Sequence, residues 1–263
     1  MTGEGPDAMH DDRDWRLDRI QARKQHRAYG MGLGVILLDD LQPGFPGDVR
    51  NASAYPFPIQ YEIAEGVGAH ALVYADDKRP CREPVLRAAQ KLASMGCRAI
   101  AGECGFFAYF QKDVAECVDV PVFMSSLLQV PLAQHVIGPH RTVGIMVWAK
   151  AALTAAHLEA VGVSPGGNYV VYGMEESGHC PELANLLDRR ELSYATVEKE
   201  LIHMAREFYR SCPTMGAMVL ECSVVPPWAR AVQRALDLPV FSWGTLLEYA
   251  YSVVVHRGYE GHV

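Results

Sequence analysis

The chain has 263 residues, of which 49% are hydrophobic and 21% charged, and it carries a formal net charge of −7. This composition is that of an ordinary globular protein, and the acidic balance argues against nucleic acid as a partner. No apolar run approaches the roughly 20 residues of a membrane span, and the first residues do not resemble a secretory signal. Seven scattered cysteines without a CxxC pair argue against a disulfide scaffold or structural zinc. We expect a soluble protein of the reducing cytoplasm, without a membrane partner.

The first 29 residues are expected to form an extension outside the folded core. Residues 1–14 are rich in Gly, Asp and Pro, which predicts a disordered segment. The stretch Trp15–Arg27 is compatible with a short basic helix, although its apolar residues show little periodicity. We therefore place the start of the folded core near residue 30.

Short apolar runs recur along the chain from Gly34 onward. They are apolar at successive positions, a pattern typical of parallel strands that are covered on both faces. The predicted strands are Val35–Leu38, Ala71–Tyr74, Ala99–Ala101, Val120–Phe123, Val143–Val147, Tyr169–Tyr172, Ala217–Leu220 and Pro239–Phe241. Helical patterns lie between several of them, the clearest being Glu83–Ser94 and Ala195–Tyr209. Strands that alternate with helices predict an α/β fold with right-handed crossovers.

The two halves of the chain repeat each other. Cys104 and Cys222 each follow a glutamate, and each precedes by 15 residues an aspartate that opens the phrase DVPVF or DLPVF. Looser echoes relate residues 34–40 to 144–150 and residues 71–77 to 169–176. The alternative is a chance likeness among Val-rich strands, but it does not explain the constant offset of 118 residues between the cysteine segments. The repeat predicts two similar βα domains related by a pseudo-twofold axis.

The duplicated cysteine has a chemical interpretation. Each thiol comes directly after a predicted strand and before a helical pattern, at the sheet edge where ligands bind in α/β folds. A helix N-terminus is expected to lower the thiol pKa, which favours proton transfer near neutral pH. Two thiols facing each other across a pseudo-dyad suit inversion at a carbon acid, with the N–H groups of Gly105 and Ser223 stabilising the carbanion. This chemistry requires no metal, pyridoxal phosphate or other cofactor.

Purely structural roles are the alternative for the cysteines and for the residues near them. Most cysteines are buried structural residues, and we interpret the five that have no partner in the repeat in this way: Cys81, Cys97, Cys117, Cys180 and Cys212. Glu103 and Glu221 are interpreted as polar residues at strand ends, with a supporting role in the site as the alternative. The histidines at 135, 140 and 179 lack the spacing of metal ligands, so no metal site is predicted.

With these motifs the sequence resembles the aspartate/glutamate/hydantoin racemase superfamily from about Gly34 to Val255. The segments that carry the resemblance are GVILLDDLQPGFPGDVRN, GECGFF, VPVFMSSLLQVP, VGIM and VLECSVVPP. The resemblance implies two Rossmann-like domains with the active site in the cleft between them, and a homodimer. It also implies that the chain crosses twice, so that residues 30–124 plus 243–263 form the first domain and 125–242 the second.

The resemblance also implies roles for individual residues. Cys104 and Cys222 match the two proton-transfer thiols, Asp39 matches an acid near the substrate, and Asn51 and Ser125 lie in segments that contribute to the pocket. Two departures matter for the substrate. Gly105-Phe106 stands where amino-acid racemases commonly have Asn-Thr, and Ser223-Val224 stands where glutamate-type enzymes commonly have Thr-His. These departures argue against free aspartate or glutamate and favour a more apolar or cyclic carbon acid.

Other polar residues are weighed individually. Trp148 and Lys150 end the first predicted strand of the second domain, so Lys150 is a candidate for binding a substrate carboxylate, with a solvated surface lysine as the alternative. Ser126 is either a hydroxyl donor to the substrate or a helix cap. The loop LQPGFPGDVRN at 41–51 is long enough to act as a lid or cleft wall, with an ordinary turn as the alternative.

Together these features predict a cofactor-independent racemase or epimerase that acts on an amino acid, a hydantoin-like compound or a related small acid by two-base thiol chemistry. One alternative is an arylmalonate-type decarboxylase or a cis-trans isomerase on the same fold. The other is a two-lobed metabolite-binding protein without catalysis. Loss of turnover on mutation of either cysteine would separate the racemase from the binding protein.

Overall fold

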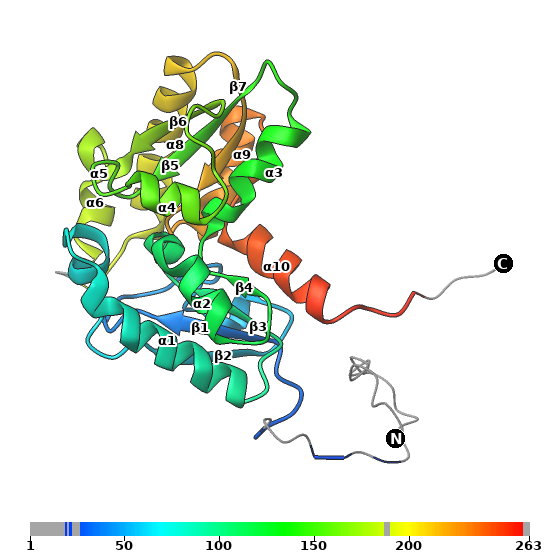
Figure 1. The fold of residues 1–263 in the computed structure, drawn as a ribbon. Coiled ribbons are helices and arrows are strands. Elements are labelled where there is room, and N and C mark those ends of the chain that lie inside the picture. The colour runs from blue at the N-terminus through cyan, green and yellow to red at the C-terminus, as the bar shows by residue number, and fades with distance from the viewer. Residues whose placement is uncertain (1–18, 20, 23–26, 187–189, 260–263) are drawn as a thin grey trace.

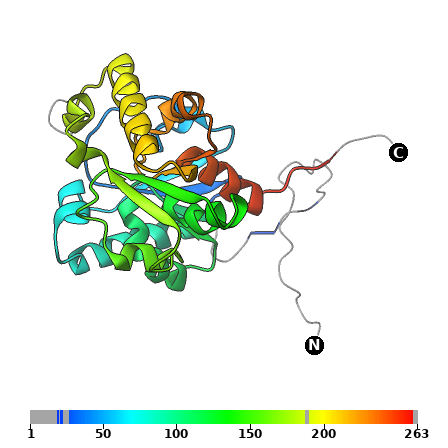
Figure 2. The same cartoon turned by 90° about the horizontal axis from the view of Figure 1, so that it is seen from above.

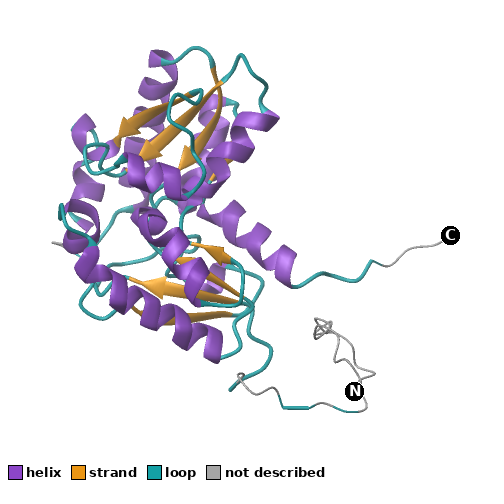
Figure 3. Ribbon diagram, viewed as in Figure 1, coloured by secondary structure: helices purple, strands orange, loops and turns teal. Residues whose placement is uncertain are grey.

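In the computed structural model, which describes residues 19, 21–22, 27–186 and 190–259, the chain forms two four-stranded parallel sheets with helices on both faces (Figures 1 and 3). The predicted fold class is therefore confirmed. The predicted disordered segment and most of the predicted helix over 15–27 lie outside the described residues. None of the helices in the described part of the chain combines the length and hydropathy of a membrane span.

The first sheet has the strand order β2-β1-β3-β4, and the second sheet repeats it as β6-β5-β7-β8. The strands of the first sheet are β1 Leu33–Leu37, β2 Ile59–Ile63, β3 Ala99–Gly102 and β4 Val122–Phe123. Those of the second sheet are β5 Thr142–Val147, β6 Tyr169–Gly173, β7 Met215–Leu220 and β8 Val240–Phe241. Gly34 pairs with Ile100 in the first sheet, as Gly144 pairs with Met218 in the second, so the looser echo between β1 and β5 is structural.

Side chains alternate between the two faces of each sheet, and a separate set of helices covers each face. In the first sheet, α1 Arg79–Ser94 and α2 Gln111–Cys117 pack on one face. In the second sheet, α8 Tyr194–Ser211 and α9 Ala229–Leu236 cover one face, and Figure 2 shows α8 in yellow along that side. The opposite face is covered by α3 Gln129–Val136 and α4 Ala155–Ala160, while two short helices, α5 Met174–Ser177 and α6 Pro181–Ala184, follow β6.

The chain crosses between the two sheets twice. After β4 it enters α3, which packs against the second sheet, and after β8 it returns as α10 Trp243–Val254 to cover the first sheet (Figure 1, red). The two crossing segments also touch each other, because Gln129 Nε2 donates a hydrogen bond of 2.9 Å to the Ser242 carbonyl. Trp243 Nε1 donates to the Glu221 carbonyl at 2.7 Å, which ties the second crossing to the strand end beside Cys222.

One predicted strand is wrong. Residues His70–Tyr74 form a short π-helical turn (η2), and the edge strand of the first sheet is Ile59–Ile63 instead. The run Ala-Leu-Val-Tyr is apolar because Leu72 and Val73 are buried in the core below α1, a need that a helical turn meets as well as a strand does. The echo between residues 71–77 and 169–176 is therefore wrong as well, since β2 is the partner of β6 in strand order.

Candidate active site

A pocket of about 230 Å³ lies where the carboxyl ends of the two sheets face each other. Cys104 follows β3 and Cys222 follows β7, so each sheet brings one thiol to it. The lining comes from both halves of the chain: Leu38, Gln42, Ala69, Val73, Tyr74, Glu103, Cys104, Phe106, Trp148, Glu175, Leu183, Ala184, Leu186, Glu221, Cys222, Ser223 and Val224. None of these described lining residues is Lys or Arg, whereas three are glutamates.

The backbone around the two thiols is nearly the same. Cys104 is the N-cap of a 3-10 helix (η3, Gly105–Phe110), and the N–H of Phe106 donates a hydrogen bond that favours its thiolate. In the second half, the N–H of Val224 does the same for Cys222. The offset between Phe106 and Val224 is again 118 residues, so the sequence repeat extends to the hydrogen bonds that serve the sulfur atoms.

The predicted lowering of the thiol pKa is wrong. Burial raises the pKa of Cys104 well above its ordinary value, and the nearby carboxylates of Glu221 and Glu103 raise it further. Burial also raises the pKa of Cys222, again with a contribution from Glu221. The helix dipoles do not offset this rise in the thiol pKa values. The helix after Cys104 (η3) is a 3-10 helix of only six residues, and the helix after Cys222 (η5, Pro226–Trp228) begins four residues beyond the thiol. Both thiols are therefore protonated at rest near neutral pH.

Glu103 joins the two halves of the site. It is buried, and its Oε2 accepts a hydrogen bond of 3.2 Å from the Leu38 N–H at the end of β1. Its Oε1 accepts from Gln42 Nε2 at 3.0 Å and from the Ser223 hydroxyl, across the domain boundary, at 3.3 Å. Arg50 lies beside it with Nε 3.0 Å from Oε1, which supplies the positive charge that a buried carboxylate needs.

Glu221 occupies the equivalent position in the second half, with one difference. Its Oε2 accepts a hydrogen bond of 3.1 Å from the Trp148 N–H, as Glu103 does from Leu38. Its side chain packs across the boundary against Gly105, the residue that matches Ser223. No ion pair to Glu221 occurs among the described residues, and burial raises its pKa to about 7. The two glutamates are thus related in position, but only Glu103 is compensated by a cation.

The loop at 41–51 forms a wall between the two domains. The Phe45 ring contacts the Trp228 ring edge-on, with centroids 5.6 Å apart, and the Val49 N–H donates to the Ser223 carbonyl at 3.4 Å. The same loop carries Asp48, which is fully buried and whose Oδ1 accepts from the Arg50 N–H at 2.7 Å. Burial raises the pKa of Asp48 to about 7. The loop therefore delivers Arg50 to Glu103 and lies against the segment that follows Cys222.

Aromatic and acidic side chains form one side of the pocket. Trp148 Nε1 donates a hydrogen bond of 2.8 Å to the Tyr74 hydroxyl, which in turn donates to Glu175 Oε1 at 2.8 Å. Tyr74 comes from the π-helical turn of the first domain, whereas Trp148 and Glu175 follow β5 and β6 of the second. Together with Phe106, these side chains present aromatic rings and a carboxylate to the pocket, a combination that attracts cations.

Of the residues predicted for the site, the structure brings Cys104, Cys222, Trp148 and Ser223 into the pocket lining. Gly105 is buried directly behind it against Glu221. The other five lie outside the lining: Asp39 Oδ2 accepts from the Gly66 N–H, Asn51 and Ser125 cap short 3-10 helices, Ser126 donates to the Leu220 carbonyl, and Lys150 is exposed.

Several residues of the site were missed in the sequence. Gln42, Tyr74 and Glu175 carry no local signal, because they come from a loop, a turn and a short helix that the topology brings together. The glutamates are different, since their position before both cysteines is itself part of the repeat. This duplication is the sequence signal from which their role in the site could have been predicted.

A pH profile tests the state of the thiols. If a thiolate of Cys104 or Cys222 starts the reaction, kcat/KM should rise with pH from about 7 to beyond about 9, because a raised thiol pKa delays formation of the thiolate. The measurement is kcat/KM across this range with a substrate that does not titrate there. A plateau already reached below about pH 7 would contradict the raised pKa values.

Comparison with known proteins gives relatives of two kinds. No family model matches the chain. It is 26% identical to dimethylsulfoniopropionate lyase 7 of Emiliania huxleyi over 80% of this chain and 63% of the relative. It is also 26% identical to a dimethylsulfoniopropionate lyase of Durusdinium sp. clade D, over 80% of this chain and 70% of the relative. Against lyase 3 of Emiliania huxleyi the chain spans only 56% of the relative's length.

Solved structures share the fold at lower identity. Unliganded arylmalonate decarboxylase matches with a TM-score of 0.53 at 16% identity, over 88% of this chain and 94% of that one. Allantoin racemase from Klebsiella pneumoniae matches with a TM-score of 0.55 at 18% identity, over 85% and 87%. Glutamate racemase from Francisella tularensis in complex with D-glutamate matches with a TM-score of 0.53 at 15% identity, over 85% and 81%.

Proposed function

We propose that this chain, which has the fold of the aspartate/glutamate/hydantoin racemase superfamily, is an enzyme that removes a proton from the carbon next to a carboxylate. The first candidate reaction is β-elimination from a 3-sulfoniopropionate, the substrate type in the names of its sequence relatives. The observation that carries the proposal is one pocket that holds two thiols, three glutamates and aromatic rings, with neither Lys nor Arg among its described lining residues.

The reaction needs one base and one group that stabilises negative charge. One thiolate takes the proton from C2, the electron pair forms the C2–C3 double bond, and the C3–S bond breaks with its electrons going to sulfur. With dimethylsulfoniopropionate the products are acrylate and neutral dimethyl sulfide, and the proton passes from the thiol to solvent. In this proposal the opposite thiol donates a hydrogen bond to the carboxylate oxygen on which charge develops.

A cationic substrate also resolves the problem of the protonated thiols. The carboxylates that raise the thiol pKa values attract a sulfonium group electrostatically. Once bound, the positive sulfur offsets their charge and favours the thiolate in the complex. A dicarboxylate such as aspartate or glutamate would bring a second negative charge to a pocket that already contains three glutamates.

The test is incubation of the purified, reduced protein with dimethylsulfoniopropionate in deuterated water. We expect acrylate in the NMR spectrum and dimethyl sulfide in the headspace, at a rate proportional to enzyme. The absence of both products at millimolar substrate would overturn elimination as the function. The same mixture without enzyme gives the spontaneous rate at each pH.

The aromatic side of the pocket predicts a preference for cations. The matched inhibitors are 3-(trimethylammonio)propionate and 4,4-dimethylpentanoate, which have the same shape and differ in charge, and we expect the cation to bind about tenfold more tightly. Trp148→Leu should remove most of that difference, while Trp148→Phe, which keeps a ring, should retain it. Inhibition constants for both compounds against all three proteins test this. Equal binding of the two compounds to the unaltered protein would contradict a cation-binding pocket.

A racemase or epimerase remains the second candidate, favoured by the equivalent placement of the two thiols in the two halves of the repeat. Without a leaving group on C3, the same carbanion is reprotonated, and a thiol on the opposite face inverts the centre. Amino acids, hydantoins and 2-substituted acids in deuterated water should then lose their α-proton signal with inversion. Exchange without elimination, abolished by mutation of either thiol, would select this reaction over the lyase.

A further inference from the structure

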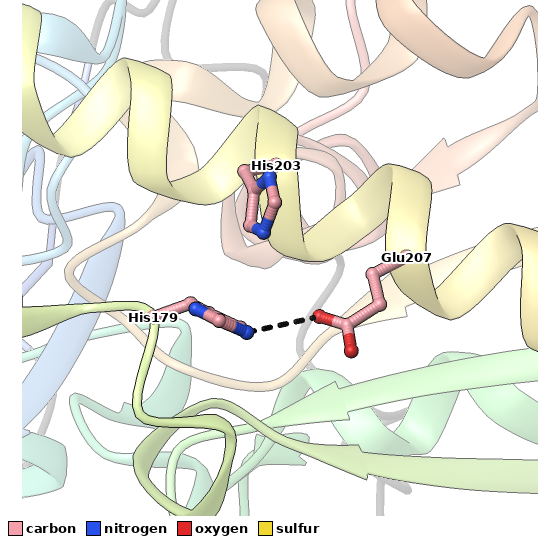
Figure 4. A group of neighbouring side chains, drawn as sticks. All are labelled: His179, His203 and Glu207. Atoms are coloured by element: carbon pink, nitrogen blue, oxygen red, sulfur yellow. Dashed lines mark ion pairs between the residues drawn. The ribbon is translucent and has the colours of Figure 1, made fainter.

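Among the described residues, one group of three potential metal ligands lies away from the thiols. It consists of His179, in the turn after α5, and of His203 and Glu207, one helical turn apart on α8 (Figure 4). Their nearest ligand atoms all lie within 4.8 Å of one another. From the sequence no metal site was predicted at His179, since its neighbours lack the spacing of metal ligands, and His203 lies 24 residues further along the chain.

The geometry of this group suits a transition metal. Ligand atoms bound at about 2.1 Å around a tetrahedral ion lie about 3.4 Å apart. His179 Nε2 and Glu207 Oε2 are 3.8 Å apart, and the two imidazole rings meet edge to face with centroids 4.8 Å apart. Small rotations of these side chains would complete the approach. Their exposed fractions of 49% for His179 and 46% for Glu207 leave the group open to ions from solution.

A supporting contact orients the carboxylate. The Tyr172 hydroxyl, from β6, donates a hydrogen bond of 2.9 Å to Glu207 Oε2. Hydrogen bonds to a ligating carboxylate are typical of metal sites, where they fix the orientation of the ligand oxygen. Two imidazoles with one carboxylate are a donor set that Zn²⁺ prefers, whereas Mg²⁺ and Ca²⁺ prefer oxygen ligands alone.

We propose that His179, His203 and Glu207 bind one divalent transition-metal ion, with Zn²⁺ as the representative ligand and water in the remaining position. By the same donor set, Cu²⁺ and Ni²⁺ also bind, and Mg²⁺ does not. The site is separate from the thiol pocket, so its existence does not depend on the proposed reaction.

The proposed metal site lies next to a segment that lines the thiol pocket, so a bound ion would also restrain that segment. The segment that follows His179 carries three residues of the pocket lining, Leu183, Ala184 and Leu186. Glu200 of α8 already holds this segment, because its Oε1 accepts from the Glu182 N–H at 2.9 Å. Glu200, His203 and Glu207 share one face of α8. A bound ion adds a second attachment at the other end of the segment and steadies this side of the pocket.

The experiment compares Zn²⁺ binding by the full chain, His203→Ala and Glu207→Gln with that by His135→Ala, a control that removes an exposed histidine elsewhere. All four proteins keep the seven cysteines, so binding to thiols is common to them. Competition with a chromophoric chelator should show one Zn²⁺ bound by the full chain and the control, and binding weakened at least about tenfold in the two site variants. Mg²⁺ should not compete.

Hydrogen exchange gives the second measurement. Zn²⁺ should slow amide exchange over Cys180–Leu186 in the full chain and the control, and it should have no such effect in His203→Ala. Unchanged Zn²⁺ affinity in both site variants would overturn the proposed site and assign the ion to the thiols. Loss of affinity without any change in exchange would keep the site and overturn its effect on the pocket.

Discussion

Replacing Cys104 or Cys222 with alanine is expected to lower kcat/KM about a thousandfold or more in each case. One alanine removes the base, which contributes roughly 10²–10⁴-fold, and the other removes the hydrogen-bond donor to the developing charge, of similar size. Both thiols line the same pocket, and each sulfur accepts a hydrogen bond from a backbone N–H. We therefore expect both thiols to take part in the reaction. The measurement is initial rate against substrate concentration for each variant.

The control for this prediction is Cys212→Ala. Cys212 is half-buried at the end of α8, outside the pocket lining, and its replacement should leave kcat/KM within about twofold of the unaltered protein. Thermal unfolding of all three variants shows whether a loss of rate comes from a loss of structure. Retention of more than about a tenth of the activity by either pocket variant would contradict a paired role for the thiols.

Gly105→Ala is expected to cost both stability and activity. A methyl group at this position would overlap the carboxyl group of Glu221, which packs directly on the glycine and is held there by the Trp148 N–H that donates to its Oε2. Overpacking of this kind costs about 1–3 kcal/mol. For a chain of this size the melting temperature should fall by roughly 2–10 °C. Since Glu221 lies beside both thiols, kcat/KM should also fall about a hundredfold.

The matched control lies at the equivalent position of the other half. Ser223→Ala removes only the 3.3 Å hydrogen bond to Glu103, which keeps Arg50, Gln42 and the Leu38 N–H as partners. Its cost in stability should be about 1 kcal/mol or less. If Gly105→Ala melts at the same temperature as Ser223→Ala and keeps full activity, Glu221 is free to move and the site is less constrained than its packing indicates.

Much of the fold follows from local sequence, but one edge strand of the first sheet does not. Seven of the eight strands were predicted, because strands of a buried parallel sheet are continuously apolar. The edge strand Ile59–Ile63 reads IQYEI and is half-buried, so no such run marks it. The apolar run at Ala71–Tyr74 was assigned to a strand instead, and periodicity over four residues cannot separate a strand from a buried helical turn.

The candidate site was predicted as far as the repeat reaches. Cys104 and Cys222 follow from a constant offset that is visible in the sequence, whereas Glu103 and Glu221 were interpreted as polar strand ends, with a supporting role only as the alternative. The thiol pKa values were predicted in the wrong direction, because they depend on burial and on carboxylates that arrive from the opposite domain. Likewise, the contact between Arg50 and Glu103 joins residues that are 53 positions apart in the sequence, and local sequence patterns do not predict contacts over such a separation.

The return of α10 to the first sheet has a consequence for how the protein is made. Leu33, Val35 and Ala101 are covered by Trp243, Leu246 and Leu247, which leave the ribosome only after the whole second sheet has been synthesised. During synthesis, one apolar face of the first sheet is therefore exposed to solvent until the second half of the fold has been made. Shortened chains that end before Trp243 should aggregate during expression, and supplying α10 as a separate peptide would be the natural way to rescue them.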